Sequence, residues 1–204
     1  MKPSSELHAV AARVGSALRN RGIRAVLTGG ACASIHSAGA YSSLDLDFVV
    51  TDSTTVTALD AAMQTVGYRR DGDHYTNPRT EFFVEFPPGP LSIGDDSDLR
   101  PVLRARGAAR FWTLSATDSC RDRLAAFYHW KDRQSLAVAL QIALANRVNM
   151  KRIEKWSLAE GAEQGFREFR QELASARREV ASAASAARQR KKTAAGRAPG
   201  ARTK

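Results

Sequence analysis

Residues 26–50 read VLTGGACASIHSAGAYSSLDLDFVV, and this stretch determines how the rest of the chain is interpreted. It predicts a strand, a glycine turn, a short helix of small residues and a second strand. Gly29 and Gly30 allow the backbone to turn sharply and to approach a ligand closely. The helix behind them would present unpaired N–H groups and the positive end of its dipole, which together form a binding site for phosphate oxygens.

Two acidic residues, Asp45 and Asp47, lie on the second strand of this stretch. Because alternate residues of a strand share a face, their carboxylates start about 6.6 Å apart on one side, while Leu46 and Phe48 face a core. Two carboxylates at that spacing are able to bind a shared divalent cation. Two other interpretations stay open here: the glycine pair as an ordinary strand-to-helix turn, and the aspartates as a solvated strand end.

A third acid lies in the segment FFVEF, residues 82–86. The aromatic and β-branched residues predict a short strand, and a lone Glu85 in its middle is costly unless it is paired or bound to a metal. If this strand pairs beside the one that carries Asp45 and Asp47, Glu85 becomes the third carboxylate of the site, as a base or as a ligand of a second metal ion. The alternative is that Glu85 faces solvent.

Together, Gly29-Gly30, the segment DLDF at 45–48 and the segment VEF at 84–86 resemble the active-site signature of the nucleotidyltransferase superfamily with the DNA polymerase β-like fold. Residues 122–133, DRLAAFYHWKDR, are similar to the helical motif of AbiEii and MenT-type toxin nucleotidyltransferases. In that family a Lys-Asp or Arg-Asp pair follows a Lys/Arg-Leu-x-Ala helix.

The resemblance implies an NTP-dependent enzyme that moves a nucleoside monophosphate to an acceptor hydroxyl. Asp45, Asp47 and Glu85 would then bind Mg²⁺ (or Mn²⁺), Lys131 would contact the nucleotide phosphates, and Asp132 would orient a base or a basic neighbour. The toxin branch further implies an RNA acceptor, the 3′ end of tRNA, and a cognate antitoxin protein as inhibitor. A different interpretation of Asp132, as a simple helix cap, stays open.

The sequence departs from the family pattern in its phosphate-binding residues. Ala31 stands where many relatives carry Ser or Thr after the glycine pair, which leaves Ser34, Ser42 and Ser43 as substitutes, with Ser43 preferred. The lysine that the toxins carry shortly after the third carboxylate is also absent, so Lys131 is the first candidate to neutralise the triphosphate.

Two further functional interpretations compete with transfer to RNA. One is nucleotidyl transfer to a small-molecule or protein hydroxyl. The other is a catalytically silent RNA-binding module, against which the retention of three carboxylates argues, because an acidic cluster without metal is repulsive.

The chain of 204 residues has a formal net charge of +10, and the charge is uneven. Residues 188–204 hold seven Lys or Arg side chains and no acid. We expect a disordered basic tail that attracts a phosphate backbone without reading its sequence. The alternative is a solubilising terminus without a partner.

Cys32 and Cys120 show neither metal-ligand spacing nor a disulfide framework, so both are interpreted as reduced thiols of a cytoplasmic protein. We expect no membrane association, since no apolar run approaches the ~18 residues of a membrane span and the N-terminus lacks the apolar core of a signal peptide.

The expected architecture is α/β: a nucleotidyltransferase-type mixed sheet flanked by helices in residues 1–114, then a C-terminal helical bundle in 115–187, with the site in the cleft between them. Expected helices cover 4–20, 31–38, 54–65 (capped by Asp52 or Ser53), 116–128, 131–146, 149–160 and 163–187. Expected strands cover 23–28, 44–50, 68–71, 74–77, 81–86, 99–105 and 110–113.

Four arginines fall on the last two expected strands, which a turn at Gly107 joins. They would form a basic ribbon for a polynucleotide acceptor, or a solvated edge hairpin that charge protects from aggregation. These are Arg100, Arg104, Arg106 and Arg110.

Overall fold

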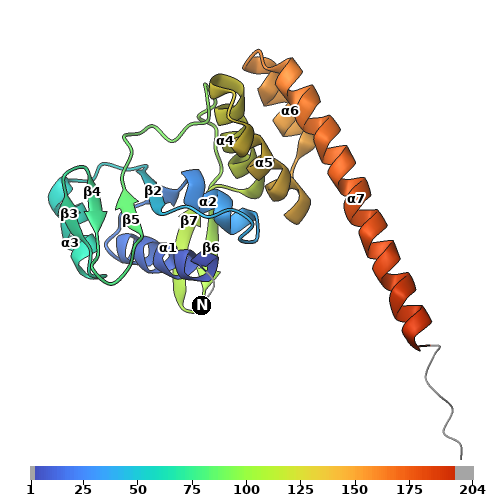
Figure 1. Ribbon diagram of the computed structural model, residues 1–204. Helices are drawn as coiled ribbons and strands as arrows, with labels where there is room; N and C mark the ends of the chain where they lie inside the picture. Colours follow the sequence, from blue (N-terminus) through green and yellow to red (C-terminus); the bar gives the residue numbers. More distant parts are fainter. Residues whose placement is uncertain (1–2, 196–204) are drawn as a thin grey trace, which may run out of the picture.

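The computed structural model describes the backbone of residues 3–195 and the side chains of residues 5–187 (Figure 1). The helices in this range are α1 (Pro3–Asn20), α2 (Gly29–His36), α3 (Val56–Gln64), α4 (Ala116–Trp130), α5 (Arg133–Ala145), α6 (Met150–Ala159) and α7 (Glu163–Ala195). The strands are β1 (Ala25–Leu27), β2 (Asp45–Val50), β3 (Arg69–Asp71), β4 (His74–Thr76), β5 (Phe83–Glu85), β6 (Val102–Arg106) and β7 (Ala109–Thr113).

The seven strands form one mixed sheet in the order β3-β4-β5-β2-β1-β7-β6. Central strand β1 pairs antiparallel with β2 and parallel with β7, and β2 pairs parallel with β5. Helix α1 packs on one face so closely that a Cβ at Gly15 would overlap Phe111 and contact Phe48. The expected mixed sheet flanked by helices is confirmed, with Phe48 facing the core as the alternation predicted.

Helices α4 to α7 form the expected helical region beside the sheet (Figure 1). Phe166, Phe169 and Leu173 bury the first turns of α7 against this region. The helix then continues to Ala195, so the expected end at residue 187 is wrong, and residues 188–195 are helical in backbone where we expected disorder. Residues 196–204 of the predicted tail lie outside the described part of the chain.

A buried arginine ties the β5–β6 loop to the helical region. Arg121 is fully buried and forms ion pairs with Asp118, at 2.9 Å, and with Asp96 of the loop. Its guanidinium lies 4.9 Å from the ring centroid of Trp156, whose indole N–H donates to the carbonyl of Ile93 at 3.2 Å. A buried charge is tolerated only when it is paired in this way.

Two expected boundaries differ from the structure. Helix α3 is capped by Thr55, whose side chain accepts a hydrogen bond from the N–H of Ala58, and not by Asp52 or Ser53. Asp52 instead accepts a bond from the N–H of Arg24 at 3.0 Å. Strand β6 begins at Val102 rather than at residue 99, because Pro101 has no N–H to donate to a ladder.

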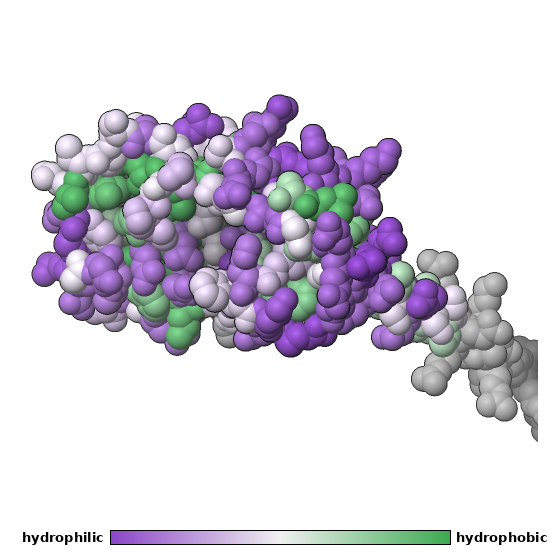
Figure 2. All heavy atoms as spheres, turned by 90° about the horizontal axis from the view of Figure 1, so that it is seen from above, coloured by the Kyte–Doolittle hydropathy of each residue, from purple (hydrophilic) through white to green (hydrophobic). Residues whose placement is uncertain are grey.

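The surface seen in Figure 2 is mostly hydrophilic, with hydrophobic groups confined to scattered patches. Among the described helices, none is both long enough and apolar enough to cross a bilayer.

Candidate active site

The register of β2 and β5 gathers three carboxylates on one face of the sheet. Asp45 lies opposite Phe83, and Asp47 lies opposite Glu85, in parallel pairing. Since Asp45, Asp47 and Glu85 occupy alternate positions of paired strands, they project to the same side. The pairing on which the prediction of a third carboxylate depended is therefore present, and all three side chains are partly exposed.

The two glycines bring the start of α2 against this face. Gly29 has φ +59°, a conformation that favours glycine, and a Cβ at this position would overlap Oδ2 of Asp47. A Cβ at Gly30 would overlap Oγ of Ser43. Any larger residue in this turn would therefore displace a side chain of the site.

The N-terminus of α2 is left open toward the site. Its cap residue, Thr28, has extended backbone and makes no side-chain capping bond. The N–H of Thr28 donates to the carbonyl of Asp47 at 2.9 Å, which fixes the turn to β2. The first-turn N–H groups of α2 thus remain available to an anion, and the helix dipole favours negative charge there.

The electrostatics of the carboxylates show an uncompensated negative site. The pKa of Asp47 is raised to about 6 by burial first, and then by the charges of Asp45, Glu85 and Asp122, while Arg123 acts in the opposite direction. Burial and like charges both disfavour the ionised form. A bound cation would reverse that effect, so the donor set fits a divalent metal.

Among the described residues, no three or more His, Cys, Asp or Glu side chains converge into a ready-made metal cage. Mg²⁺ is usually held by one or two carboxylates together with substrate phosphates and water, not by an all-protein cage. Asp45 and Asp47 beside an open helix N-terminus match that mode of binding.

The three candidate serines lie in different surroundings, and one of them contacts a carboxylate of the site. Ser43 is buried and donates its hydroxyl to Oδ1 of Asp45, so it orients a carboxylate of the site. Ser34 is also buried, but it donates to the carbonyl of Tyr41 at 2.7 Å. The hydroxyl hydrogen of Ser34 is thus engaged inside the fold, and its role as a phosphate contact stays a prediction. Ser42 is exposed.

Lys131 and Asp132 occupy the turn between α4 and α5. Lys131 is exposed, ends α4 with φ 55°, and lines a hollow of about 580 Å³ beside Glu160. Asp132 caps α5 by accepting bonds from the N–H groups of Gln134 and Ser135, at 2.9 and 3.2 Å. The hydrogen bonds at its carboxylate hold the pKa of Asp132 below its usual value. The open interpretation of Asp132 as a helix cap matches this geometry.

No hydrogen bond or ion pair in the described part of the chain joins Lys131 or Asp132 to the three carboxylates. Lys131 follows Arg123 by eight residues, roughly 12 Å along the helix axis. A catalytic role for the pair stays a prediction.

Two residues of α4 lie closer to the carboxylates, and sequence reasoning gave them no role. Arg123 pairs with Asp122 at 2.7 Å, and the charges of both act on Asp47. Burial acts to lower the pKa of Arg123, but the charge of Asp122, its hydrogen bond and the charges of Tyr41 and Cys32 together outweigh burial and raise that pKa. The signal was present, because Arg123 begins the Arg-Leu-x-Ala part of the family-like motif.

The expected arginine ribbon is an edge hairpin that turns at Gly107. Arg104 lies 3.3 Å from Nδ1 of His36, and Arg106 donates to the carbonyl of Ser5 at 3.1 Å. Arg110 donates to the carbonyl of Gly107 at 2.8 Å. These three side chains form hydrogen bonds or close contacts with α1, with α2 and with their own turn. This favours the interpretation of the segment as an edge hairpin that charge protects from aggregation.

Comparison with solved structures identifies the fold of the chain. No protein-family model and no curated protein matches the chain. An antigenic nucleotidyltransferase-like protein from Paracoccidioides brasiliensis superposes with a TM-score of 0.57 at 13% identity, over 89% of this chain and 93% of that chain. The chain has a nucleotidyltransferase fold.

Two structures of the antibiotic-resistance factor ANT(2'')-Ia are more distant. One is a solution structure, with a TM-score of 0.46 and 12% identity over 87% of this chain and 98% of that chain. The other is a complex with adenylyl-2''-tobramycin, with a TM-score of 0.45 and 13% identity over 82% of this chain and 98% of that chain. Both TM-scores lie below 0.5, so these two likenesses carry no argument about this chain.

Proposed function

We propose that the protein transfers a nucleoside monophosphate from a nucleoside triphosphate to an acceptor hydroxyl, with RNA as the acceptor. The observation that carries the proposal is the register of β2 and β5, which sets Asp47 opposite Glu85 and beside Asp45. The open N-terminus of α2 adjoins these carboxylates through Gly29.

In the proposed site, Asp45 and Asp47 would hold Mg²⁺ (or Mn²⁺), and Glu85 would complete the set. When bound, the metal would supply charge neutralisation for the triphosphate and would lower the pKa of the acceptor hydroxyl. The first-turn N–H groups of α2 orient phosphate oxygens, and Ser43 holds Asp45 in place.

The transfer itself is a displacement at the α-phosphorus. The acceptor oxygen forms a bond to the α-phosphorus while the bond to the bridging oxygen of pyrophosphate breaks, and pyrophosphate leaves with that electron pair. Glu85 accepts the proton of the hydroxyl. Arg123 is placed to offset negative charge near Asp47. Lys131 would meet the distal phosphates, with Asp132 fixing the start of α5 behind it.

RNA as acceptor, the 3′ end of tRNA in particular, is supported by the resemblance of residues 122–133 to the toxin motif and by the basic charge of the chain. The same resemblance supports a toxin role with a cognate antitoxin. Cys32 and Cys120 are buried and unpaired thiols, which suits the reducing cytoplasm in which we place the enzyme.

A labelling experiment tests the proposal. The protein is incubated with Mg²⁺, total RNA and each of the four α-labelled nucleoside triphosphates in turn. We expect label in RNA, lost on addition of a chelator. Label in protein or in a small molecule would redirect the proposal to another acceptor, and RNA binding without label would indicate a silent module.

Expression in a bacterial host without antitoxin tests the toxin role separately. We expect growth arrest that Asp45→Ala relieves at equal expression. Normal growth under strong expression of enzyme shown to be active would contradict a toxin.

A further inference from the structure

A hollow of about 1280 Å³ lies between α1, the end of α3 and the β3–β4 hairpin. A second hollow, of about 470 Å³, lies between the end of α1 and the β6–β7 turn. The two hollows share Arg13, Thr65 and Val66 as lining residues, so they adjoin one another, and we refer to them together as the α1 groove.

The lining of the α1 groove is strongly cationic. It contains six arginines and a single acidic side chain, Asp60. That carboxylate is already bonded to Arg70 at 2.9 Å and to the hydroxyl of Tyr75 at 2.7 Å. The six are Arg13, Arg19, Arg69, Arg70, Arg79 and Arg110.

Four of these arginines have no partner within the described residues. Arg13, Arg19, Arg69 and Arg79 are exposed, and no ion pair or side-chain hydrogen bond engages their guanidinium groups there. A guanidinium fork binds phosphate oxygens in a bidentate manner. Clustered like charges repel one another, and a bound polyanion would relieve that repulsion.

Hydrogen bonds hold the backbone of the groove walls, so the loop positions that carry the arginines are defined. Asn77 is buried, donates to the carbonyl of Val66 at 3.2 Å, and accepts the N–H of Arg79 at 3.0 Å. The hydroxyl of Tyr68 donates to the carbonyl of Phe82 at 3.0 Å. These bonds hold the loop that bears Arg79 against the end of α3.

The length of the groove suits a chain of phosphates better than one small anion. Arg13 and Arg19 are six residues apart on α1, about 9 Å along the helix axis. Arg69 and Arg79 extend the cationic lining from α1 to the β3–β4 hairpin. Charges repeated along a trough match the repeated charges of a nucleic-acid backbone.

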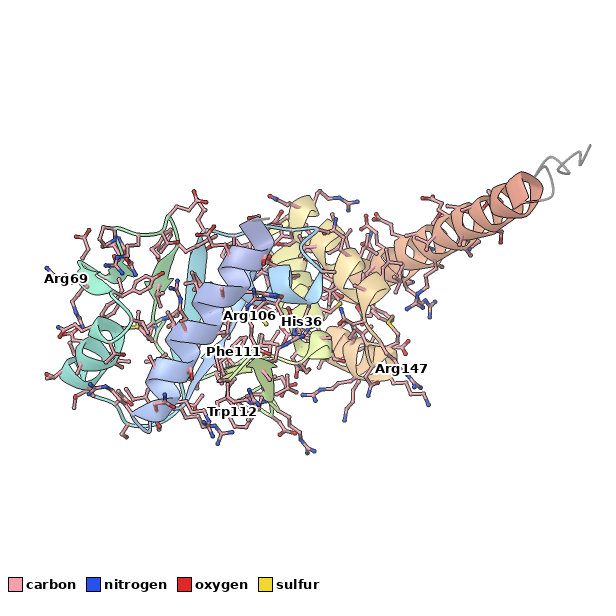
Figure 3. The ribbon with its side chains drawn as sticks, turned by 90° about the horizontal axis from the view of Figure 1, so that it is seen from below. His36, Arg69, Arg106, Phe111, Trp112 and Arg147 are labelled. Carbon is pink, nitrogen blue, oxygen red and sulfur yellow. The ribbon has the colours of Figure 1, made fainter. Side chains whose placement is uncertain are left out.

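The α1 groove is separate from the carboxylate site. Helix α1 covers the sheet face to which Phe48 points, as its contact at Gly15 shows, whereas Asp45 and Asp47 project to the other face. Figure 3 views the molecule from the α1 side, with Arg69 at one end and Arg147 near the other end of the main body.

We propose that the α1 groove binds the phosphodiester backbone of single-stranded RNA, away from the reacting hydroxyl. Its role in positioning an acceptor rests on the proposed function, whereas RNA binding by the groove does not. Because the guanidinium groups contact phosphates and not base edges, binding is independent of sequence and weakens as salt rises.

The test compares two variants that each remove three exposed positive charges. The groove variant carries Arg13→Gln, Arg69→Gln and Arg79→Gln. The control variant carries Arg147→Gln, Lys155→Gln and Arg178→Gln, all in the helical region and exposed. Affinity for a short fluorescent single-stranded RNA is measured by anisotropy over a salt series, without nucleotide.

We expect the groove variant to bind about tenfold more weakly at low salt, and its slope of log K against log salt to fall by about 2, from roughly 0.7 per lost phosphate contact. The control variant should change affinity less than about twofold. Equal losses in both variants, at unchanged melting temperatures, would show that net charge alone attracts RNA and would overturn the proposal.

Two further arms separate related outcomes. Polyglutamate that binds as tightly as RNA and loses affinity equally in the groove variant would overturn the assignment to phosphate in favour of an acidic protein surface. If the wild type binds RNA through the groove but never transfers a nucleotide, the proposed activity is refuted, whereas the proposal of RNA binding by the groove is supported.

Discussion

Asp47 and Glu85 lie directly opposite each other on the paired parallel strands β2 and β5. Two carboxylates in that relationship repel unless a proton or a cation lies between them. The arrangement therefore favours the binding of a proton or a cation, and the first two predictions depend on this preference.

Asp45→Asn and Asp47→Asn should each abolish nucleotide transfer while the fold is retained, because the exchange keeps side-chain volume and removes a metal-binding charge. The measurements are labelled-nucleotide transfer with Mg²⁺ and circular dichroism. Asp71→Asn is the matched control, since Asp71 is exposed on β3. Retained transfer by either site variant would falsify the metal-ligand assignment.

The stability advantage of Asp47→Asn should depend on pH in metal-free solution. The folded-state pKa of Asp47 is about 6, above the ordinary value of 3.8, so ionisation of this group destabilises the folded protein at pH values above 6. We expect the variant to melt higher than the wild type at pH 7.5, and the gap to shrink as pH falls through 6 toward 4. A gap that does not vary with pH would contradict the shifted pKa.

Gly29→Ala should lower activity far more than Gly72→Ala. Both glycines have positive φ, +59° and +63°, so both substitutions carry backbone strain of about 1 kcal/mol. Only at Gly29 does the new Cβ meet a site residue, Oδ2 of Asp47, whereas the Cβ at Gly72 meets nothing within 4 Å. A misplaced carboxylate should reduce kcat about 100-fold. Equal activities at matched stability would argue against the close approach.

Asp132→Ala should cost about 1 kcal/mol of unfolding free energy through loss of the α5 cap, and Asp132→Asn should restore most of it, because Asn is an equally good cap. Denaturant titration measures the stability, and transfer per folded molecule measures the chemistry. If Asp132→Asn is stable but inactive, the carboxylate acts in catalysis as well. In the same assay, Lys131→Ala should lower kcat/KM if Lys131 contacts the triphosphate. The loss should correspond to about 1.5–3 kcal/mol of transition-state stabilisation.

Deleting residues 188–204 should weaken RNA affinity and reduce its salt dependence while leaving turnover at saturating RNA unchanged. Seven cations are removed, and each accounts for a slope of at most about 0.9. The comparison is a chain of the same length with neutral residues at the seven positions. If the slope of log K against log salt is unchanged after the deletion, this segment does not contribute to RNA binding.

The order of elements and the carboxylate face were predictable because both follow from local rules. The alternation of Asp45 with Leu46 fixes which side chains share a face, and the glycine pair marks the turn. The helical backbone of residues 188–195 was predictable as well, since this segment contains only helix-compatible residues. The expectation of disorder gave more weight to the charge of the segment than to its helix propensity.

The remaining site residues depend on tertiary packing, which one sequence does not contain. The proximity of Arg123 to Asp47 arises only when α4 packs on α2. The hydrogen bond from Ser34 to the carbonyl of Tyr41 is a further example, because the sequence does not show which side of a short, buried helix meets a loop. The arginines of the α1 groove come from distant segments of the chain, so no local sequence motif predicts the groove.

The burial of Arg121 has a consequence for how the molecule unfolds. Its ion pair with Asp96 spans the boundary at residue 114 between the sheet and the helical region, whereas Asp118 lies on the same helix as Arg121. Separating the two parts would break the ion pair with Asp96 and the hydrogen bond from the Trp156 indole to the carbonyl of Ile93. The sheet and the bundle are therefore coupled energetically, and calorimetry should record one cooperative heat-absorption peak in which neither part melts ahead of the other.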